Sequence, residues 1–309
     1  MMAQSKVKAD VRLKDFWRQN DRFADLFNAV VFEGKEVIKP DSLQEMDTDM
    51  SGIIQFPDYE DSVVRIRDVV KKMAYGVEFV VMGIDNQMKI HYGMPLRALL
   101  YDGLGYLKEY QGIAKQRKNE GGKVTEDEFL SKIRKEDRLH PIITIVIYYN
   151  EKPWDGPLCL RDMMVEMPEK ISRIFSDYKM NLVQVRDSDR YIFNNEDVKT
   201  VFEISREIFR GNLDQITQRY NRNIDAELAA VIGQITDFNE IIRQASEKEV
   251  VNMCTALEKW EKRAEEHGAE KNQREIILKL LKKGYNAEQI EDLLDVPSSR
   301  VLIIQKEAE

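Results

Sequence analysis

Two aspartates occupy positions that a predicted hairpin would place side by side. Residues 61–73 and 77–85 are rich in β-branched and other apolar residues, and a short turn around Gly76 separates them, which favours an antiparallel hairpin. If Gly76 lies near the centre of that hairpin, the numbers of facing positions sum to about 153. Asp68 and Asp85 satisfy this sum, so the sequence predicts that their carboxylates lie next to each other.

Two facing carboxylates repel each other, and a bound cation would neutralise their charge. Like charges opposite each other destabilise a sheet, and carboxylate oxygens are ligands that suit Mg²⁺ or Mn²⁺. Side chains alternate along a strand, so Gln87 shares the face of Asp85. A metal ion there would polarise a phosphodiester and lower the pKa of an attacking water. A solvated surface patch, with Arg65, Arg67 and Lys71 nearby, is the more common outcome of such a pattern and stays open at this point.

Four strings in the chain resemble one known family. They are RFADLFN, RIRDVV, GIDNQMKIHYGMPLRALLYDGLGYLKEYQ and PIITIVIYYNEKPWDGP. Together they are similar to the recombination-promoting nuclease / putative transposase family, which belongs to the PD-(D/E)xK nuclease superfamily. The similarity covers roughly residues 15–190.

The resemblance implies a role for five residues. Asp68 matches the first aspartate of the superfamily pattern, Asp85 matches its second acid, and Gln87 stands where many members have lysine. Arg97 and Tyr101 match an arginine and a tyrosine one turn apart on the next helix, where both would face a DNA phosphate. Comparable members carry glutamate at the position of Asp85, and Gln87 lacks the positive charge of lysine, so we expect slow chemistry.

The function implied by the resemblance is Mg²⁺-dependent (or Mn²⁺-dependent) endonuclease cleavage of double-stranded DNA, linked to recombination or to a mobile element. Two alternatives stay open. One is a non-catalytic relic of a transposable element that keeps the fold and binds DNA or protein. The other is a nuclease with an antiphage or toxin role.

A further acid on the first helix is a candidate metal ligand. Residues 15–32 have apolar residues at helical spacing, which predicts an amphipathic helix. Superfamily members often place an acid there, and Asp25, or less favourably Asp21, would be that acid. Both project opposite the apolar stripe, which favours solvent exposure for both side chains.

The elements around these residues predict an α/β (α+β) fold. Pro95 suits the first turn of a helix, and residues 141–149 form a continuous apolar run typical of a buried central strand. The polar residues 112–138 are expected to be a solvated loop or an exposed helix. We therefore predict a restriction-endonuclease-like αβββαβ core in residues 15–150, within a nuclease-like domain of residues 15–195.

Residues 196–309 are predicted to be a wholly helical C-terminal region. Its last part, residues 273–307, has three short helical segments: Gly284 ends one, and Asn286 with Gln289 begins another as a capping box. This tail is helix-turn-helix-like, but its last segment has few cations, so DNA binding and dimerisation are both kept as roles.

Bulk composition narrows the class of protein. The chain has 309 residues and a net charge of −8, which argues against non-specific coating of nucleic acid. Its two cysteines show no zinc-ligand spacing. The N-terminus lacks an apolar signal segment, and the longest apolar stretch is too short to span a membrane. We expect a cytoplasmic protein whose partner is double-stranded DNA, with a homodimer left open.

Overall fold

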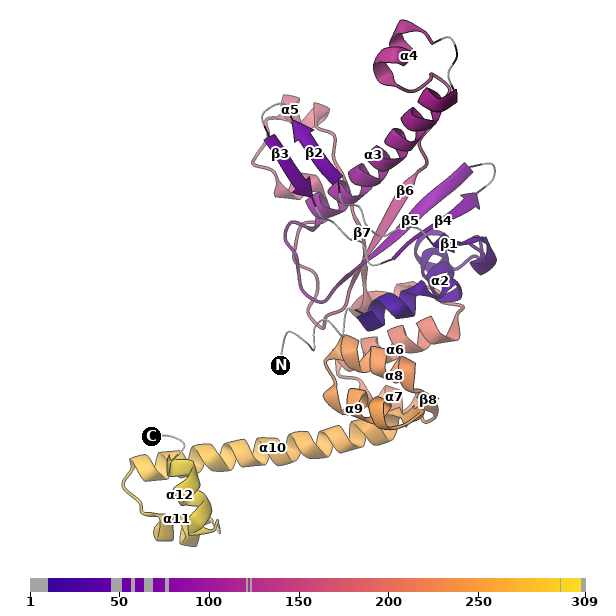
Figure 1. The fold of residues 1–309 in the computed structure, drawn as a ribbon. Coiled ribbons are helices and arrows are strands. Elements are labelled where there is room, and N and C mark those ends of the chain that lie inside the picture. Colours follow the sequence, from indigo (N-terminus) through magenta and orange to yellow (C-terminus); the bar gives the residue numbers. More distant parts are fainter. Residues whose placement is uncertain are drawn as a thin grey trace.

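A five-stranded mixed sheet is the central feature of the computed structural model (Figure 1). The structure describes residues 11–45, 52–56, 59–63, 69–75, 78–120, 122, 124–294 and 296–306. The strands of the described residues are β1 (Gln44–Glu45), β2 (Gly52–Phe56), β3 (Tyr59–Val63), β4 (Val69–Tyr75), β5 (Glu78–Gln87), β6 (Ile142–Tyr148), β7 (Asn181–Gln184), β8 (Asn223–Asp225) and β9 (Val250–Asn252). The sheet has the order β1-β4-β5-β6-β7, antiparallel from β1 to β5 and parallel from β5 to β7.

The register of the β4–β5 hairpin agrees with the sequence prediction. All seven pairs, from Val69 with Ile84 to Tyr75 with Glu78, have residue numbers that sum to 153. Of the strand predicted at residues 61–73, residues 69–73 lie in β4, whereas residues 61–63 belong to β3 and pair with β2 in a separate small sheet. Residues 64–68 lie outside the described part of the chain. The predicted partner of Asp85, Asp68, therefore lies outside the described residues.

Helices cover both faces of the sheet (Figure 1). The helical elements are η1 (Pro40–Ser42), η2 (Leu160–Met163), η3 (Val185–Arg190), α2 (Asn20–Val31), α3 (Met94–Glu120), α4 (Glu126–Ser131), α5 (Glu169–Ile174), α6 (Glu196–Arg210), α7 (Leu213–Arg219), α8 (Ala226–Thr236), α9 (Asn239–Glu247), α10 (Met253–Lys282), α11 (Ala287–Leu294) and α12 (Ser298–Lys306). Side-chain alternation along β6 shows the two layers: Ile145 and Ile147 join the core that contains α2, whereas Val146 packs with Met94 and Ala98 of α3.

The chain first forms a helix (α2), then three antiparallel strands (β1, β4 and β5), then a helix (α3) and a strand parallel to β5 (β6). The β2–β3 hairpin is inserted between β1 and β4. The mixed α+β class and the buried central strand are confirmed. The predicted first helix is interrupted at Gln19, between helical residues 11–18 and α2. Lys71 of β4 fills this break by donating hydrogen bonds to the Arg18 carbonyl and the Asn20 side chain. Lys71, which the sequence analysis named only within the open alternative of a solvated patch, is buried, and burial lowers the pKa of its ammonium group.

The C-terminal region continues the same core. Val198, Phe202 and Leu257 belong to one apolar cluster with Trp17 and Ile147, so packing crosses the boundary expected at residue 195. The region is also not wholly helical as predicted, because β8 and β9 pair antiparallel. These three-residue strands carry too little periodicity to be recognised in the sequence.

The last helices form a second, small core. Ile277 of α10, Ile290 of α11 and Val301 of α12 are buried together, at the far end of the 30-residue helix α10 (Figure 1). The predicted capping box is confirmed, since the Asn286 backbone N–H donates to Gln289 Oε1 at 3.0 Å and the Gln289 N–H donates to Asn286 Oδ1 at 2.9 Å. The first of the three predicted short segments is the end of α10.

A buried arginine ties the helices together. Arg22 of α2 donates to Asp197 at 2.9 and 3.1 Å and to Glu227 at 2.9 Å. We expect Arg22→Ala to lower the free energy of unfolding by about 2 kcal/mol, because charge-assisted hydrogen bonds are lost while both acids keep partial access to water. Arg173→Ala, which removes an exposed pair with Glu169, should cost less than about 0.5 kcal/mol. Urea unfolding of the two variants measures both values, and equal losses would contradict the bridging role of Arg22.

Two smaller observations complete the fold. Cys159 and Cys254 are free cysteines. Among the helices that the structure describes, none combines the length and apolarity needed to cross a bilayer.

Candidate functional site

Asp85 lies near the carboxyl end of β5, on the side of the sheet that α3 covers. It pairs in parallel register with Val146, which packs against α3, and its exposed fraction is 2%. A buried carboxylate is stable only when nearby groups compensate its charge. The neighbours of Asp85 therefore define the site.

The structure brings three other predicted residues to Asp85. Gln87 Nε2 donates a hydrogen bond to Asp85 Oδ1 at 2.6 Å. Arg97 Nε lies 3.6 Å from Asp85 Oδ2 and donates to the Tyr101 hydroxyl at 2.8 Å. The Arg97 guanidinium also lies 5.4 Å from the centre of the Tyr101 ring. Asp85, Gln87, Arg97 and Tyr101 thus form one continuous set of contacts, which we call the β5–α3 site.

Local sequence explains this arrangement. Positions 85 and 87 share a strand face, and Pro95 sits in the first turn of α3, where its missing N–H costs nothing. Arg97 and Tyr101 are one turn apart and share a helix face. The Arg97 side chain is 31% exposed, whereas Tyr101 is 1% exposed. Arg97 and Gln87 are both partly exposed, and the Tyr101 hydroxyl orients the Arg97 guanidinium.

A hydrogen-bond chain holds the end of β5 from the opposite face. Trp17 Nε1 donates to the Tyr149 hydroxyl at 2.8 Å, and that hydroxyl donates to Asn86 Oδ1 at 2.7 Å. Because Asn86 lies between Asp85 and Gln87 in the chain, these bonds help to fix the direction of both site side chains. The sequence analysis missed this chain, which joins residues more than 60 positions apart.

A buried acid next to the site fixes α3 on the sheet. Asp102 accepts hydrogen bonds from Thr144 Oγ1 at 2.7 Å and from the Tyr178 hydroxyl at 2.6 Å. On β6, Tyr148 is paired with Gln87 and is buried, and burial raises the pKa of its phenol. The sequence analysis did not name Tyr148; the two-residue period of a strand, with the parallel register of β6 and β5 known, would have placed it on the face of Gln87.

Asp25 is placed differently from the sequence prediction. It was expected to be exposed, but its exposed fraction is 6%, because the segment before α6 covers it and the Asn194 backbone N–H donates to its Oδ1 at 2.8 Å. Burial raises the pKa of the Asp25 carboxyl. Asp25 belongs to the α2 face of the sheet, whereas Asp85 contacts Arg97 of α3. Asp21 is exposed, as expected, and accepts a hydrogen bond from Asn195.

The metal-ligand set expected from the sequence is described only in part. Asp68 lies outside the described residues, and among those that the structure does describe no group of three or more His, Cys, Asp or Glu side chains is close enough to hold a metal ion. A metal at the β5–α3 site would need Asp85 and a second acid. The predicted ligand roles of Asp68, Asp85 and Asp25 stay predictions.

Comparison with known proteins gives one match. The model of a family described as "Putative transposase, YhgA-like" matches residues 125–231, about a third of the chain. The matched stretch includes β6, which lies beside β5, and β7, which lies beside β6, but it begins after all six predicted site residues. No curated protein and no solved structure matches the chain. Residues 125–231 are thus similar to that family of putative transposases.

Proposed function

We propose that this chain is a divalent-metal-dependent DNA endonuclease of the PD-(D/E)xK type, acting in recombination or in the movement of a mobile element. The observation that carries the proposal is the contact of Asp85, Gln87 and Arg97 at the end of β5. This is the acid-x-Gln strand followed by an arginine-bearing helix that the sequence resemblance implies. The helix-strand order of the core and the transposase-like match support the same proposal.

Each residue has a chemical task in the proposal. Asp85, together with Asp68, would hold Mg²⁺ or Mn²⁺, since hard divalent ions prefer carboxylate oxygens. When bound, such an ion polarises the phosphodiester and lowers the pKa of water. Gln87 orients Asp85 with its amide N–H, and its carbonyl oxygen is an acceptor for the attacking water. Arg97 would contact a non-bridging phosphate oxygen, where negative charge develops as a P–O ester bond breaks.

A plasmid assay tests this proposal. Purified protein is incubated with supercoiled plasmid and Mg²⁺, Mn²⁺ or EDTA, beside Asp68→Ala prepared in the same way. We expect nicked plasmid with either metal, none with EDTA, and none with the variant. Nicking by Asp68→Ala at the parent's rate would refute the assigned site.

A non-catalytic relic that binds DNA or protein is the second candidate. It is favoured by the 3.6 Å approach of Arg97 to Asp85, because the guanidinium already compensates the buried carboxylate without a metal. In that case the plasmid would stay intact under every metal condition. Retained duplex binding would then identify the chain as a DNA-binding relic, and its loss would point to protein binding.

The C-terminal unit should be dispensable for chemistry. Among the side chains that the structure describes, the α10–α12 core shares no member with the main core, in which Leu257 is the last buried residue along the chain. Truncation after His267 should therefore leave the metal requirement intact and raise the DNA concentration needed for nicking. If the unit binds DNA, the truncation should also flatten the salt dependence, because phosphate contacts are lost. Nicking across a salt series measures both effects; a well-folded truncation without activity would place the unit in the catalytic core.

A further inference from the structure

The second half of α3 extends beyond the sheet as an arm. The buried residues of this 27-residue helix end at Gly105, and Figure 1 shows the helix continuing outward to α4. An amphipathic helix normally buries a stripe along its whole length. The exposed half of α3 and the returning segment, residues 106–140, are called the arm below.

Hydrogen bonds between its two limbs hold the arm in shape. They join Ile142 N–H to the Tyr106 hydroxyl at 3.1 Å, His140 N–H to Glu109 at 3.1 Å, the Tyr110 hydroxyl to the Ser131 carbonyl at 2.5 Å, and Arg117 Nε to Asp137 at 3.2 Å. The returning segment is thus fixed along α3 from α4 back to β6. These hydrogen bonds hold the arm in one conformation, which lowers the entropic cost of binding a ligand to its surface.

The cations of the arm fall into two groups. Arg117 pairs with Glu120 and Asp137, and its hydrogen bond lowers the pKa of the Asp137 carboxyl. Arg134 lies 3.8 Å from Glu120. Three lysines, by contrast, form no ion pair with any carboxylate of the described residues, and all three are exposed: Lys115, Lys118 and Lys132. The arginines brace the arm, and the lysines are available for a ligand.

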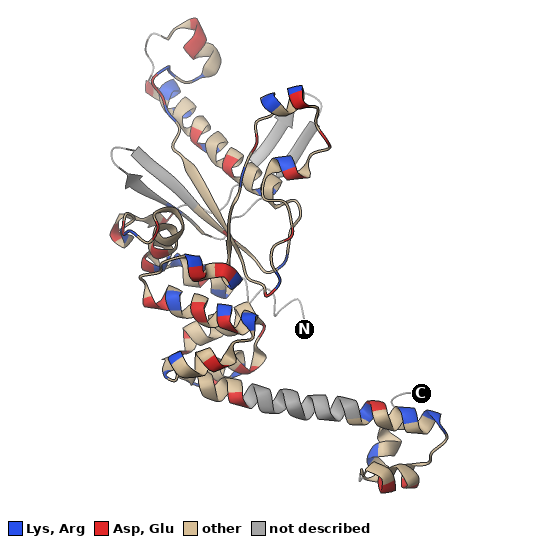
Figure 2. Ribbon diagram, turned by 180° about the vertical axis from the view of Figure 1, so that it is seen from behind, with Lys and Arg blue, Asp and Glu red and all other residues tan. Residues whose placement is uncertain are grey.

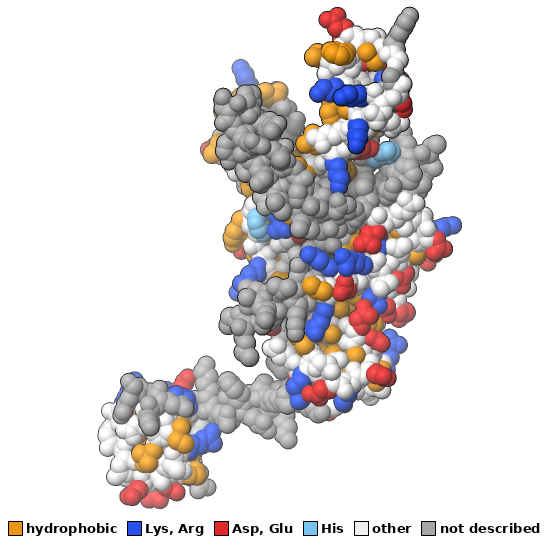
Figure 3. Space-filling model, viewed as in Figure 1, with side chains coloured by type: hydrophobic (Ala, Val, Ile, Leu, Met, Phe, Trp, Pro, Cys, Tyr) orange, Lys and Arg blue, Asp and Glu red, His pale blue; other side chains and the backbone are white. Residues whose placement is uncertain are grey.

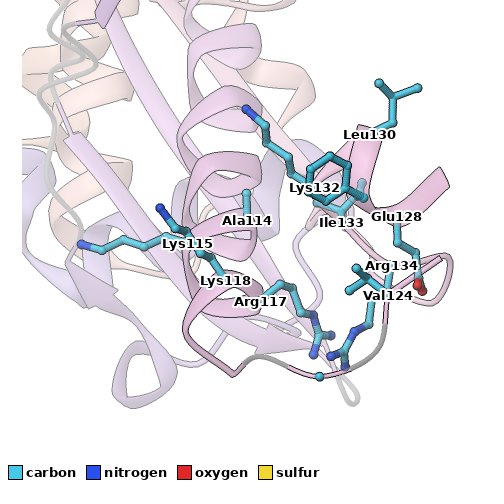
Figure 4. Close-up of a pocket in the computed structure, with 12 residues that line it drawn as sticks. Ala114, Lys115, Arg117, Lys118, Val124, Glu128, Leu130, Lys132, Ile133 and Arg134 are labelled. Carbon is cyan, nitrogen blue, oxygen red and sulfur yellow. The ribbon is translucent and has the colours of Figure 1, made fainter. Parts of the chain in front are cut away.

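These lysines are among the residues that line a hollow of about 780 Å³ between the end of α3 and α4, whose lining also includes apolar side chains such as Val124 and Leu130. In Figure 4, Lys115 and Lys118 extend from α3 away from α4, and Lys132 reaches back toward α3 from the other limb. Figure 3 shows Lys and Arg side chains gathered on this projecting part of the molecule. Figure 2 shows Asp and Glu as well as Lys and Arg on α3 and α4, as it does on the helices that follow residue 195, so these lysines stand among acids.

Helix geometry aligns the arm with the β5–α3 site. Lys115 follows Arg97 by 18 residues, the difference of their numbers, which is five turns at 3.6 residues per turn. The side chains of Arg97 and Lys115 therefore project from the same side of α3, which is the side on which Arg97 approaches Asp85 of β5. Lys108, which is exposed, lies between them along α3, and its direction about the helix axis differs from that of Arg97 by about 20°. The rise along the helix from Arg97 to Lys115 is about 27 Å.

We propose that the arm binds the phosphates of a DNA duplex that runs along α3 away from the β5–α3 site. Lys115, Lys118 and Lys132 contact the flank about eight base pairs from the phosphate beside Arg97, and Lys108 contacts it about five base pairs away, given a spacing of 3.4 Å per base pair. The proposal rests on the proposed function for the position of the cleaved phosphate. Because Lys108 and Lys115 continue the flank of α3 that carries Arg97, a duplex whose phosphate reaches Arg97 would also pass these lysines, and a polyanion is the ligand that exposed lysines attract on a chain with a net charge of −8.

Duplex binding without metal tests the arm. The variant Lys115→Gln, Lys118→Gln, Lys132→Gln is compared with Lys35→Gln, Lys170→Gln, Lys248→Gln, which removes the same charge from exposed lysines of other elements. Fluorescence anisotropy is measured in EDTA with duplexes of increasing length over a salt series. We expect the arm variant to bind long duplexes about 10-fold more weakly and to lower the salt slope by about 2 to 3. The control variant should match the parent.

Duplex length is the readout that a folding defect would not imitate. For the parent, affinity should rise as the duplex flank grows past about eight base pairs, and this rise should be absent in the arm variant. Identical length and salt dependence in the two triple variants, each with the parent's circular dichroism and melting temperature, would overturn the proposal. The binding assay contains no metal, so its result does not depend on cleavage. If the parent binds in this length-dependent way but leaves plasmid intact in the assay with Mg²⁺ or Mn²⁺, the nuclease proposal is refuted and the proposal for the arm stands.

Discussion

Asp85→Asn is expected to lower metal-dependent plasmid nicking by roughly 10³-fold. The substitution keeps the shape of the side chain and the acceptor for Gln87, which donates to Oδ1 at 2.6 Å. It removes the negative charge that would hold the cation, and a bound cation contributes several kcal/mol to the transition state. Nicking rates at saturating Mg²⁺ and at raised Mn²⁺ measure the loss, and higher metal should recover only part of it.

Folding should change little in Asp85→Asn. The variant loses the attraction of Arg97 at 3.6 Å, but it also no longer buries a charge at 2% exposure. These two contributions oppose each other, so the free energy of unfolding should stay within about 1 kcal/mol of the parent. Chemical denaturation of the metal-free protein checks this, and it separates lost chemistry from lost structure.

Asp85→Glu is the matched control for charge. It keeps the carboxylate and restores the longer acid of the resembling family, so it should nick at least as fast as the parent. Insertion of a methylene into a buried site costs about 1–3 kcal/mol of stability, which makes the assay temperature important. Equal rates for the Asn and Glu variants, measured well below both melting temperatures, would argue against Asp85 as a metal ligand.

The sequence predicted those parts of the site that depend only on residues close together in the chain. A turn position and the two-residue period of a strand were enough to predict the sum of 153, and a proline in a first turn marked the start of α3. These features also fixed the faces of Asp85 and Gln87. The four-residue spacing of Arg97 and Tyr101 needed only helix periodicity.

Features that depend on distant packing were missed. Asp25 lies opposite an apolar stripe and looks exposed, yet residue 194 arrives from 169 positions away and covers it. Lys71 is buried because it caps a break between two helical stretches that read as one helix in the sequence. The core likewise extends past residue 195, since α6 and α8 present apolar faces to the same cluster as the sheet. Periodicity identifies an apolar face but not its partner.

Arg97→Ala should reduce kcat/KM for nicking by about 10²-fold, with Tyr101→Phe reducing it about 5-fold through Arg97. Loss of one positioned donor to developing charge costs about 2.7 kcal/mol or more, which sets the first value. Tyr101 is 1% exposed, and its hydroxyl accepts from Arg97 Nε at 2.8 Å, so Phe removes the orientation of the guanidinium while keeping the ring beneath it.

The two substitutions should not be additive, and a double-mutant cycle measures this directly. In the Arg97→Ala background the Tyr101 hydroxyl has no guanidinium left to orient, so Tyr101→Phe should then cost less than 2-fold in kcat/KM. Arg97→Lys is the companion variant: it keeps the charge but loses the planar fork, and we expect it to recover about a tenth of the parent's activity. Melting temperatures of all four proteins separate these effects from unfolding. A full 5-fold loss on adding Tyr101→Phe to Arg97→Ala would show that the hydroxyl acts on the substrate independently, and the assignment of Tyr101 as a positioning residue would have to be abandoned.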